Sequence, residues 1–250
     1  MRALFALALL PASAAATPGG FQPGEGLTFS LTVGPVPAGR ARMSVGRPER
    51  LHGRRLAAVH GEAHSAEWLR LLARLDDDYR LVFDADALLP QTVSSVETGL
   101  RERTIESRFE GARIALDVVA PREQLHQRRI LPGVARDPLT ALFALRAAPL
   151  RDGDVMRPLV LDGPALYRAM MRVHGREALA TGGGPVTCVR IDVEATRIFD
   201  SGRPVGQRPR HITIWLSDDD RRVPYRISGD TDLGTARIDL TSYGAPAPGR

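Results

Sequence analysis

The stretch HITIWLSDDDRRVPYRI, residues 211–227, decides the fold class of this chain. Apolar and polar side chains alternate along both of its arms, and an alternation of period two is typical of a β-strand. The arms flank the polar segment 217–221, so the stretch is predicted to be a β-hairpin. Pro224 lacks the backbone N–H that a central strand would donate, which indicates an edge position or a bulge in the second arm.

The same alternation recurs through most of the remaining chain and predicts a mainly β protein. The acidic triplet at 76–78 is expected to be a turn because it is short and polar. The glycines at 182–184 are expected to be a turn because glycine adopts the backbone conformations that tight turns require. The basic segment 121–134 is expected to be an exposed loop. The predicted strands are 27–33, 41–45, 56–64, 79–83, 91–97, 98–110, 112–119, 167–173, 187–193 and 236–240.

Two segments instead have the apolar spacing of an amphipathic helix. The first is 65–75, with Ser65 as its N-cap, and the second is 137–146, with Asp137 as its N-cap. Pro138 suits the first helical position, where its missing N–H leaves no bond unmade. The apolar stripes are Trp68, Leu71, Leu72 and Leu75 in the first segment, and Leu139, Leu142 and Phe143 in the second.

The start of the chain has the features of a secretory signal peptide, assigned to residues 1–16 with cleavage near 14–16. Arg2 supplies the positive charge, residues 3–10 the apolar core, and small residues the cleavage site. The apolar run is shorter than the about 20 residues that cross a bilayer, so the alternative is a buried N-terminal helix. No later run is apolar enough to cross a membrane. We therefore expect a protein that is soluble in the periplasm, or secreted, after cleavage.

Residues 24–243 are expected to form a single β-rich domain, and the Pro/Gly-rich residues 244–250 a flexible tail. The chain has 250 residues, 43% of them hydrophobic, and a net charge of +5 that comes from arginine without any lysine. Only 5% of the residues are aromatic and no basic run is interleaved with aromatics, which argues against nucleic-acid binding. The single cysteine, Cys188, cannot form an intrachain disulfide and is expected in the core.

Three segments carry a resemblance to a known family. Residues 215–224 are similar to a W-L-S-D-D-x-R-R-x-P pattern, and residues 24–29 to G-E-x-L-x-Y. Residues 137–146 are similar to D-x-L-S-x-L-Y-x-L-R, with Thr140 and Phe143 in place of Ser and Tyr. On these patterns the chain, from about 24 to 240, resembles the bacterial exported family known as domain of unknown function 3108.

The resemblance implies a β-rich α+β fold in which two helices pack against an antiparallel, curved sheet or open half-barrel. Such a fold is similar to that of envelope carriers that hold lipids or lipoproteins. Fold alone does not fix function, however, and the resemblance implies no activity, cofactor or catalytic residue.

One group of candidate catalytic residues lies on a predicted strand. His60, Glu62 and His64 share one face at a two-residue period, where they could bind a metal or form a general base with its orienting partner. The alternative is the solvated polar face of a half-buried sheet. No fourth ligand is marked, so we expect neither a metal site nor a cofactor.

A second group would form if the strands from 167 onward are neighbours. Their polar faces would gather Arg222 and Arg237 with other arginines, together with Asp192, Glu194 and Asp239. This is either a cross-strand lattice of ion pairs or a concave basic wall for anionic glycans or lipid headgroups. Counting the helix stripes, the predicted ligand-binding residues are Trp68, Leu72, Phe143, Arg168, Arg172, Arg190 and Arg226.

The sequence leaves three functions open. The first is a non-enzymatic periplasmic binding or carrier module for an apolar or anionic envelope molecule, such as a lipid or an anionic glycan. The second is a glycan-active hydrolase or lyase that uses His60, Glu62 and His64 or a carboxylate near Asp218. The third is an assembly partner of an outer-membrane complex. We favour the first. The chain lacks the G-x-S-x-G, H-E-x-x-H and phosphate-loop motifs of common enzymes, but the carboxylates of a glycan-active enzyme can come from any strand, so the second function stays open. The oligomeric state also stays open.

Overall fold

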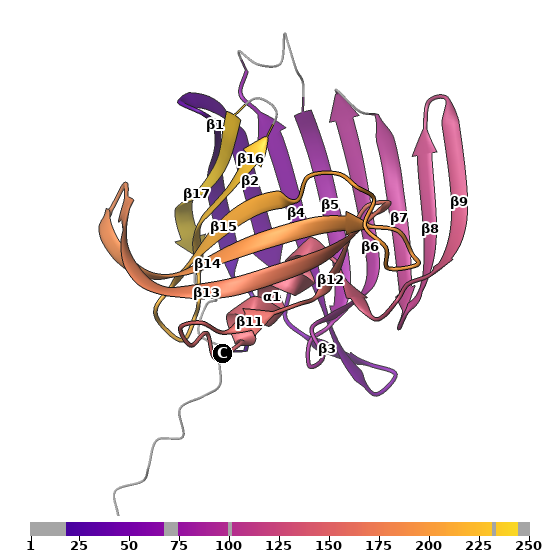
Figure 1. Ribbon diagram of the computed structural model, residues 1–250, viewed down its shortest axis with the longest axis horizontal. Coiled ribbons are helices and arrows are strands. Elements are labelled where there is room, and N and C mark those ends of the chain that lie inside the picture. Colours follow the sequence, from indigo (N-terminus) through magenta and orange to yellow (C-terminus); the bar gives the residue numbers. More distant parts are fainter. Residues whose placement is uncertain (1–18, 68–74, 100–101, 232–233, 245–250) are drawn as a thin grey trace, which may run out of the picture.

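The computed structural model describes residues 19–67, 75–99, 102–231 and 234–244. Within them the chain forms one sheet that curls into an open half-barrel, and one α-helix, as Figure 1 shows. The strands are β1 (Gly26–Val33), β2 (Val36–Val45), β3 (Glu49–Leu51), β4 (Arg54–Ser65), β5 (Leu75–Asp84), β6 (Leu89–Gly99), β7 (Arg103–Glu110), β8 (Arg113–Ala120), β9 (Glu123–Ile130), β10 (Ala135–Arg136), β11 (Val155–Met156), β12 (Leu159–Asp162), β13 (Ala165–Thr181), β14 (Gly184–Ile198), β15 (Arg210–Ser217), β16 (Pro224–Thr231) and β17 (Gly234–Gly244).

The first and last strands lie side by side within the sheet. β1 pairs with β2 on one side and with β17 on the other, so the N-terminal and C-terminal halves form one continuous surface. From β2 the sheet continues through β4 and β5 to the edge strand β9, and from β17 it continues back to β13 and β12. Among the strand pairs within the described residues, only the short β10–β12 pair is parallel. The long β13 and β14 cross in front of β4–β8 in Figure 1, which gives the half-barrel two facing walls.

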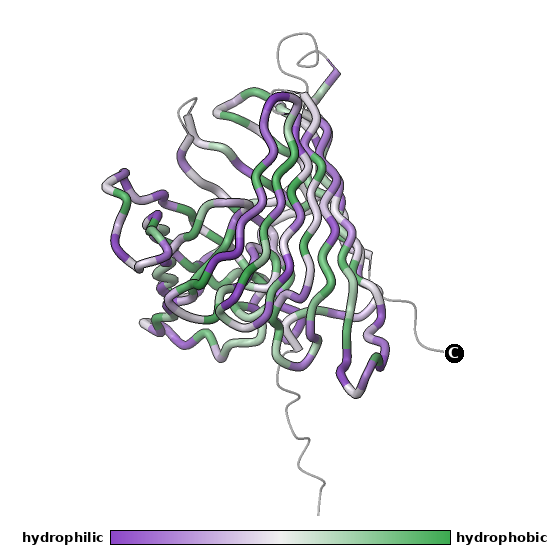
Figure 2. Tube along the Cα trace, turned by 90° about the vertical axis from the view of Figure 1, so that its right-hand side faces the viewer, coloured by the Kyte–Doolittle hydropathy of each residue, from purple (hydrophilic) through white to green (hydrophobic). Residues whose placement is uncertain are grey.

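The predicted hairpin at 211–227 is confirmed. β15 and β16 pair antiparallel, and the register shifts between Trp215 and Leu216, where Leu216 lies opposite Pro224. The bulge therefore lies where the missing N–H of Pro224 predicts it. Polar and apolar residues alternate along the strands, as the hydropathy colours of Figure 2 show, so each strand has one face toward the interior and one toward solvent.

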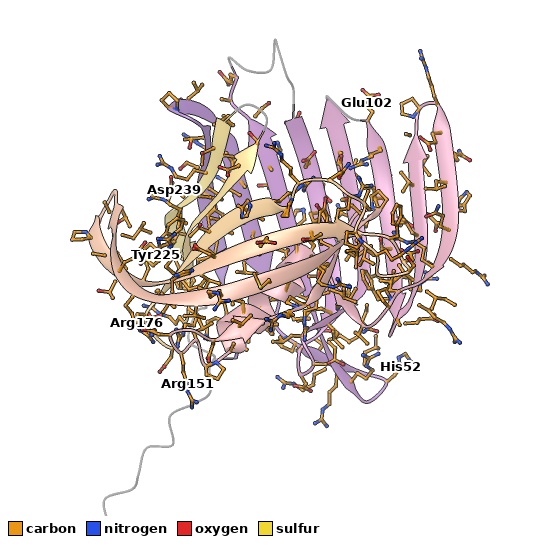
Figure 3. All side chains as sticks on the ribbon, in the orientation of Figure 1. His52, Glu102, Arg151, Arg176, Tyr225 and Asp239 are labelled. Atoms are coloured by element: carbon orange, nitrogen blue, oxygen red, sulfur yellow. The ribbon has the colours of Figure 1, made fainter. Side chains whose placement is uncertain are left out.

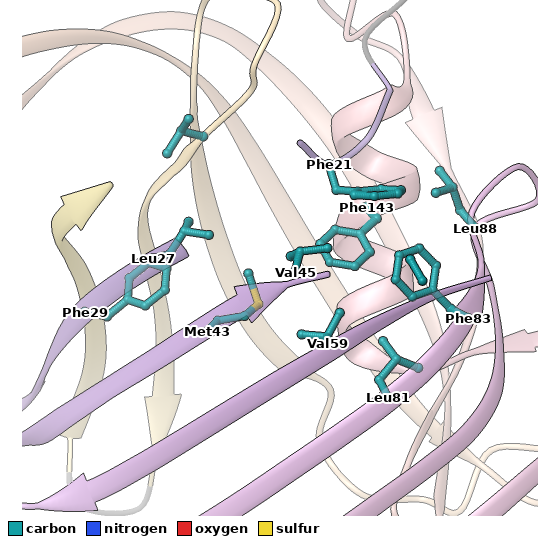
Figure 4. Close-up of a cluster of buried hydrophobic side chains, with 12 residues drawn as sticks. Phe21, Leu27, Phe29, Met43, Val45, Val59, Leu81, Phe83, Leu88 and Phe143 are labelled. Carbon is teal, nitrogen blue, oxygen red and sulfur yellow. The ribbon is translucent and has the colours of Figure 1, made fainter. Parts of the chain in front are cut away.

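The helix α1 (Pro138–Ala147) packs inside the half-barrel, between its two walls. Asp137 accepts hydrogen bonds from the backbone N–H groups of Leu139 and Thr140, which confirms the predicted cap. On one side Phe143 packs against Phe21 and Phe83, with ring centroids 5.5 and 5.3 Å away (Figure 4). On the other side the helix contacts β13, β14 and β15 through Ala141, Leu142 and Leu145.

A buried ion pair fixes the helix to the first strand region. Arg146 donates bidentate hydrogen bonds of 2.7 and 2.9 Å to Glu25, and both side chains are fully buried. Arg146 also donates to the backbone oxygen of Arg221, at 2.9 Å. Glu25, Arg146 and Arg221 come from the three segments that carry the family resemblance, so those segments meet at one point of the structure.

Three predictions about local structure are wrong or incomplete. The acidic triplet 76–78 is part of β5, where Asp76 and Asp78 bond across to His64 and His60 of β4. The segment 121–134 contains the edge strand β9, whose backbone pairs with β8 although its side chains are mostly exposed. Ser65 ends β4 and Leu75 begins β5, while residues 68–74 of the predicted first helix lie outside the described residues.

The predicted signal peptide and tail, 1–16 and 245–250, also lie outside the described residues. Gly244, the first residue assigned to the tail, instead ends β17. In the described part of the chain, no helix has the length and apolar character needed to span a bilayer.

Candidate functional site

A cavity of about 660 Å³ lies between the walls of the half-barrel. It is lined by residues of β1, β2 and β4–β7 on one wall, by residues of β12–β17 on the other, and by the first turn of α1. Its volume is in the range of small-molecule sites, about 300–1,000 Å³. Much of the lining is apolar and includes Phe29, Met43, Val93, Ile105, Leu139 and Ile227.

Small residues on the inner face of β2 and β4 leave this space open. Ala41, Gly61 and Ala63 line the cavity where neighbouring strands carry larger side chains. A Cβ at Gly61 would approach its nearest neighbours, the backbone oxygen of Arg42 and Tyr79 Cβ, only to 3.7 Å. The cavity therefore arises in part because β4 has no side chain at Gly61.

The cavity wall also carries charged side chains, which begin with an ion pair across two strands. Arg103 of β7 donates to both carboxylate oxygens of Glu97 of β6, at 2.8 and 2.7 Å. About a fifth of each side chain is exposed, so the pair is shielded from bulk water. The pair satisfies both groups, because a bidentate guanidinium–carboxylate contact uses two donors and two acceptors.

Two other carboxylates line the cavity without an ion pair to any described residue. Burial raises the pKa of the Asp77 carboxyl, and the nearby charge of Glu97 raises it further, while a hydrogen bond from the Thr98 backbone opposes the shift. The Oδ1 atom of Asp77 is buried without a hydrogen-bond partner. Burial among protein atoms also raises the pKa of the Asp162 carboxyl, and the charge of Arg210 opposes this shift. The side chain of Asp162 still contacts solvent at the cavity.

Two arginines face the cavity from the wall that β12–β17 form. Arg197 of β14 lies directly across from Tyr167 of β13, and Arg210 of β15 lies across from Ala195. The Arg210 guanidinium lies over the Tyr167 ring, 5.0 Å from its centroid. Neither arginine lies within 4.0 Å of a carboxylate among the described residues, so both cations are available to a bound molecule.

The helix end at the cavity is held in place by β5. The Tyr79 hydroxyl donates a 2.7 Å hydrogen bond to Oδ2 of Asp137, the cap of α1. Burial, together with the Asp137 charge, raises the pKa of Tyr79 well above its usual range, so this hydroxyl stays protonated and keeps donating. Leu139 and Leu142, which line the cavity, are therefore positioned by a capped and anchored helix.

The side chains of the candidate catalytic residues on β4 alternate with the inward-facing Gly61 and Ala63, so they project from the outer face of the sheet, although Glu62 is also among the residues that line the cavity. His60 bonds to Asp78 at 2.7 Å and His64 to Asp76 at 3.0 Å, and about half of each histidine side chain is exposed. Glu62 pairs with Arg42 at 3.8 Å. Among the described residues no group of His, Cys, Asp and Glu has the arrangement of a metal site. Catalysis by His60, Glu62 and His64 stays an untested prediction.

The predicted basic wall also lies on the outer face. Arg172 and Arg190 project from β13 and β14 on the side opposite Met171 and Ile191, which are buried. Their neighbours are carboxylates: Arg190 pairs with Asp192 at 3.1 Å, and Arg226 pairs with Asp239, which is labelled in Figure 3. The concave position expected for these arginines is therefore not the one observed, and their ligand-binding role stays a prediction for the outer surface.

The remaining predicted ligand-binding residues are placed as follows. Arg168 is on the same outer face and donates to the backbone oxygen of Gly202 at 3.0 Å. Phe143 is fully buried in the aromatic cluster and lies away from the cavity lining. Trp68 and Leu72 lie outside the described residues. Cys188, as expected, is buried, and burial raises the pKa of its thiol to about 11, which keeps it protonated at neutral pH.

The sequence does contain a signal for the charged cavity residues, which the prediction missed. Asp77, Arg103, Arg197 and Arg210 each occupy the phase of their strand that otherwise carries buried apolar residues, and Glu97 shares its phase with the partly buried Val93. A charged residue in the apolar phase of a strand is unfavourable unless it is paired or faces a cavity. A charged residue at an apolar position of a strand is therefore the signal that indicates a cavity residue. The arginines predicted to bind a ligand, such as Arg172 and Arg190, occupy polar positions, where surface residues are usual.

Replacing Asp162 with Asn should stabilise the ligand-free protein at neutral pH. Because the folded state raises the pKa of Asp162 above its ordinary 3.8, ionising this carboxyl disfavours folding, and Asn removes that effect. This destabilisation is absent below the ordinary pKa of Asp162, where the carboxyl is protonated in both states. It appears as the pH rises through the higher pKa that Asp162 has in the folded protein. In urea titrations at several pH values, the variant should match the wild type at low pH and exceed it at neutral pH; lower stability at neutral pH would contradict this account.

Comparisons with known proteins agree with this architecture. The model of the family described as "Protein of unknown function (DUF3108)" matches residues 28–241. No curated protein matches the chain. The crystal structure of a beta-barrel-like protein of domain of unknown function DUF1849, from Brucella abortus, has a TM-score of 0.58 at 10% identity over 89% of this chain and 98% of that chain, which shows a shared fold.

Two lipoprotein structures are more distant. The hypothetical lipoprotein YmcC from Escherichia coli has a TM-score of 0.32 at 11% identity, over 90% of this chain and 89% of that chain. The lipoprotein LppX from Mycobacterium tuberculosis has a TM-score of 0.27 at 14% identity, over 89% of this chain and 88% of that chain. At these scores neither adds to the argument about this chain.

Proposed function

Since this chain belongs to the DUF3108 family, we propose that it is an exported, non-enzymatic carrier that holds an envelope molecule in the cavity of its half-barrel. The family description assigns no activity, so the proposal rests on the molecule itself. The observation that carries it is the cavity of about 660 Å³ between α1 and two walls that carry both apolar and charged residues. An apolar pocket with a few polar groups is the usual form of a small-molecule site.

The placement of the histidines favours a carrier over a glycan-active enzyme. His60 and His64 lie on the outer face, each bonded to an aspartate and half-exposed, and not in the cavity. Catalytic groups usually converge in a cleft on a bound substrate. Changing both histidines to Ala should therefore leave binding in the cavity intact.

Export to the periplasm is part of the proposal and rests on residues 1–16. A positively charged start followed by a short apolar core and small residues is the pattern of a cleaved signal peptide. N-terminal sequencing of the protein isolated from its cell envelope should find a chain that begins shortly after residues 14–16. In that compartment an apolar ligand needs a shielded site, because water excludes it.

Replacing Gly61 with Leu should block the cavity while leaving the fold intact. The backbone at Gly61 does not need glycine, since its φ is not positive and a Cβ there meets only ordinary contacts of 3.7 Å or more. A leucine side chain would extend into the space that the ligand occupies. We expect the affinity for a fluorescent apolar probe such as 1-N-phenylnaphthylamine to fall by about tenfold or more, which corresponds to about 1.4 kcal/mol.

Gly26→Leu is the matched control. Gly26 lies in β1 on the face opposite the buried Leu27, and a Cβ there meets nothing within 4 Å. This variant makes the same chemical change outside the cavity and should bind the probe like the wild type. If both glycine variants bind equally well, the probe does not enter the cavity and the proposal loses its support.

A further inference from the structure

The polar groups of the cavity indicate which kind of molecule it holds. The inference rests on the carrier function proposed above. Nine charged residues line the cavity. Arg42 pairs with Glu62, Asp78 pairs with His60 and Arg80, and Glu97 pairs with Arg103, so these five are already satisfied. Four remain, two of each sign: Asp77, Asp162, Arg197 and Arg210. None of the four has a salt bridge within 4.0 Å to a described residue.

We propose that this cavity binds the headgroup of a zwitterionic amphiphile, one that joins an ammonium group and an anionic group to an acyl chain. The two carboxylates offer acceptors to the ammonium, and Asp77 Oδ1 is a buried acceptor with no partner among the described residues. Arg197 and Arg210 offer planar donors to the anionic oxygens. The apolar residues around Leu139 and Ile227 accommodate the chain.

Headgroups with a single charge match the cavity less well. A purely anionic headgroup held by Arg197 and Arg210 would share the cavity with Asp77 and Asp162, whose like charges repel it. A purely cationic headgroup would face the same problem with the two arginines. Arg210 and Asp162 show this mixture within one wall, since β12, which ends at Asp162, pairs with β13, and the charge of Arg210 opposes the rise in the pKa of Asp162.

The test compares soluble short-chain phospholipids on the full mature protein. Isothermal titration calorimetry would be run with phosphatidylethanolamine, which carries an ammonium, and phosphatidylglycerol, which carries none, with the same acyl chains. We expect phosphatidylethanolamine to bind at least about tenfold more tightly, a difference of about 1.4 kcal/mol. The double variant Asp77→Asn, Asp162→Asn should lose this preference and bind phosphatidylglycerol at least as well as the wild type.

The control removes two negative charges from the surface. Asp220→Asn with Glu123→Gln changes an exposed turn and the exposed edge strand β9, and should keep the preference for phosphatidylethanolamine. Thermal unfolding of each variant shows whether it is folded. Equal affinity for the two lipids, or a preference unchanged by the double cavity variant, overturns the headgroup assignment but leaves the carrier function. Absence of binding by either lipid, with no apolar probe bound, overturns both.

Discussion

Replacing Arg146 with Met should destabilise the protein by about 3–5 kcal/mol. The change leaves Glu25 fully buried with no cation beside it, and an unpaired buried carboxylate is far less stable than a hydrated one. It also removes the hydrogen bond to the Arg221 backbone oxygen, which links α1 to the turn before β16. The free energy of unfolding from urea titration at neutral pH measures the effect.

Two further variants separate the ion pair from the loss of arginine packing. In Glu25→Leu with Arg146→Met, no charge is left buried, so more than half of the lost stability should return. Arg113→Met changes an exposed arginine of β8 and should shift the stability by no more than about 0.5 kcal/mol. A single variant at Arg146 that loses less than about 1 kcal/mol would contradict the buried pair.

Replacing Phe143 with Ala should also destabilise the protein by about 3–5 kcal/mol. The Phe143 ring is fully buried between Phe21 and Phe83, and its removal leaves a cavity that these rings fill only in part. Because Phe143 holds α1 against β5, the variant should also bind the apolar probe more weakly by loosening Leu139 and Leu142.

Phe199→Ala is the control for this second change. Phe199 follows β14 and about half of its side chain is exposed, so its removal should alter stability by less than about 1 kcal/mol. Chemical denaturation of both variants gives the comparison. Similar losses at Phe143 and Phe199 would mean that the aromatic cluster does not anchor the helix.

Local chemistry explains what the sequence predicted correctly. The β15–β16 hairpin follows from strict alternation and a polar turn, and the bulge at Pro224 from its missing N–H. The start of α1 follows from Asp137 and Pro138. These features depend on residues that are close together in the chain, so a single sequence specifies them.

The wrong predictions concern contacts between distant strands. The triplet 76–78 is a strand because His64 and His60 of β4 bond to Asp76 and Asp78, which no local rule indicates. Likewise the cavity forms only where β4–β7 face β12–β17, so the sequence does not show that Arg197 faces it. The sequence predicts the site among the polar positions of each strand, which face outward. The charged residues that line the cavity instead stand at inward-facing positions, where most other residues are apolar.

Native mass spectrometry of the mature protein, isolated gently from its own envelope, tests the carrier function most directly. We expect the wild-type protein to carry one amphiphile, the Gly26→Leu variant to carry the same load, and the Gly61→Leu variant to be free of ligand. An empty wild-type protein, or a Gly61→Leu variant that keeps the full load, would contradict it.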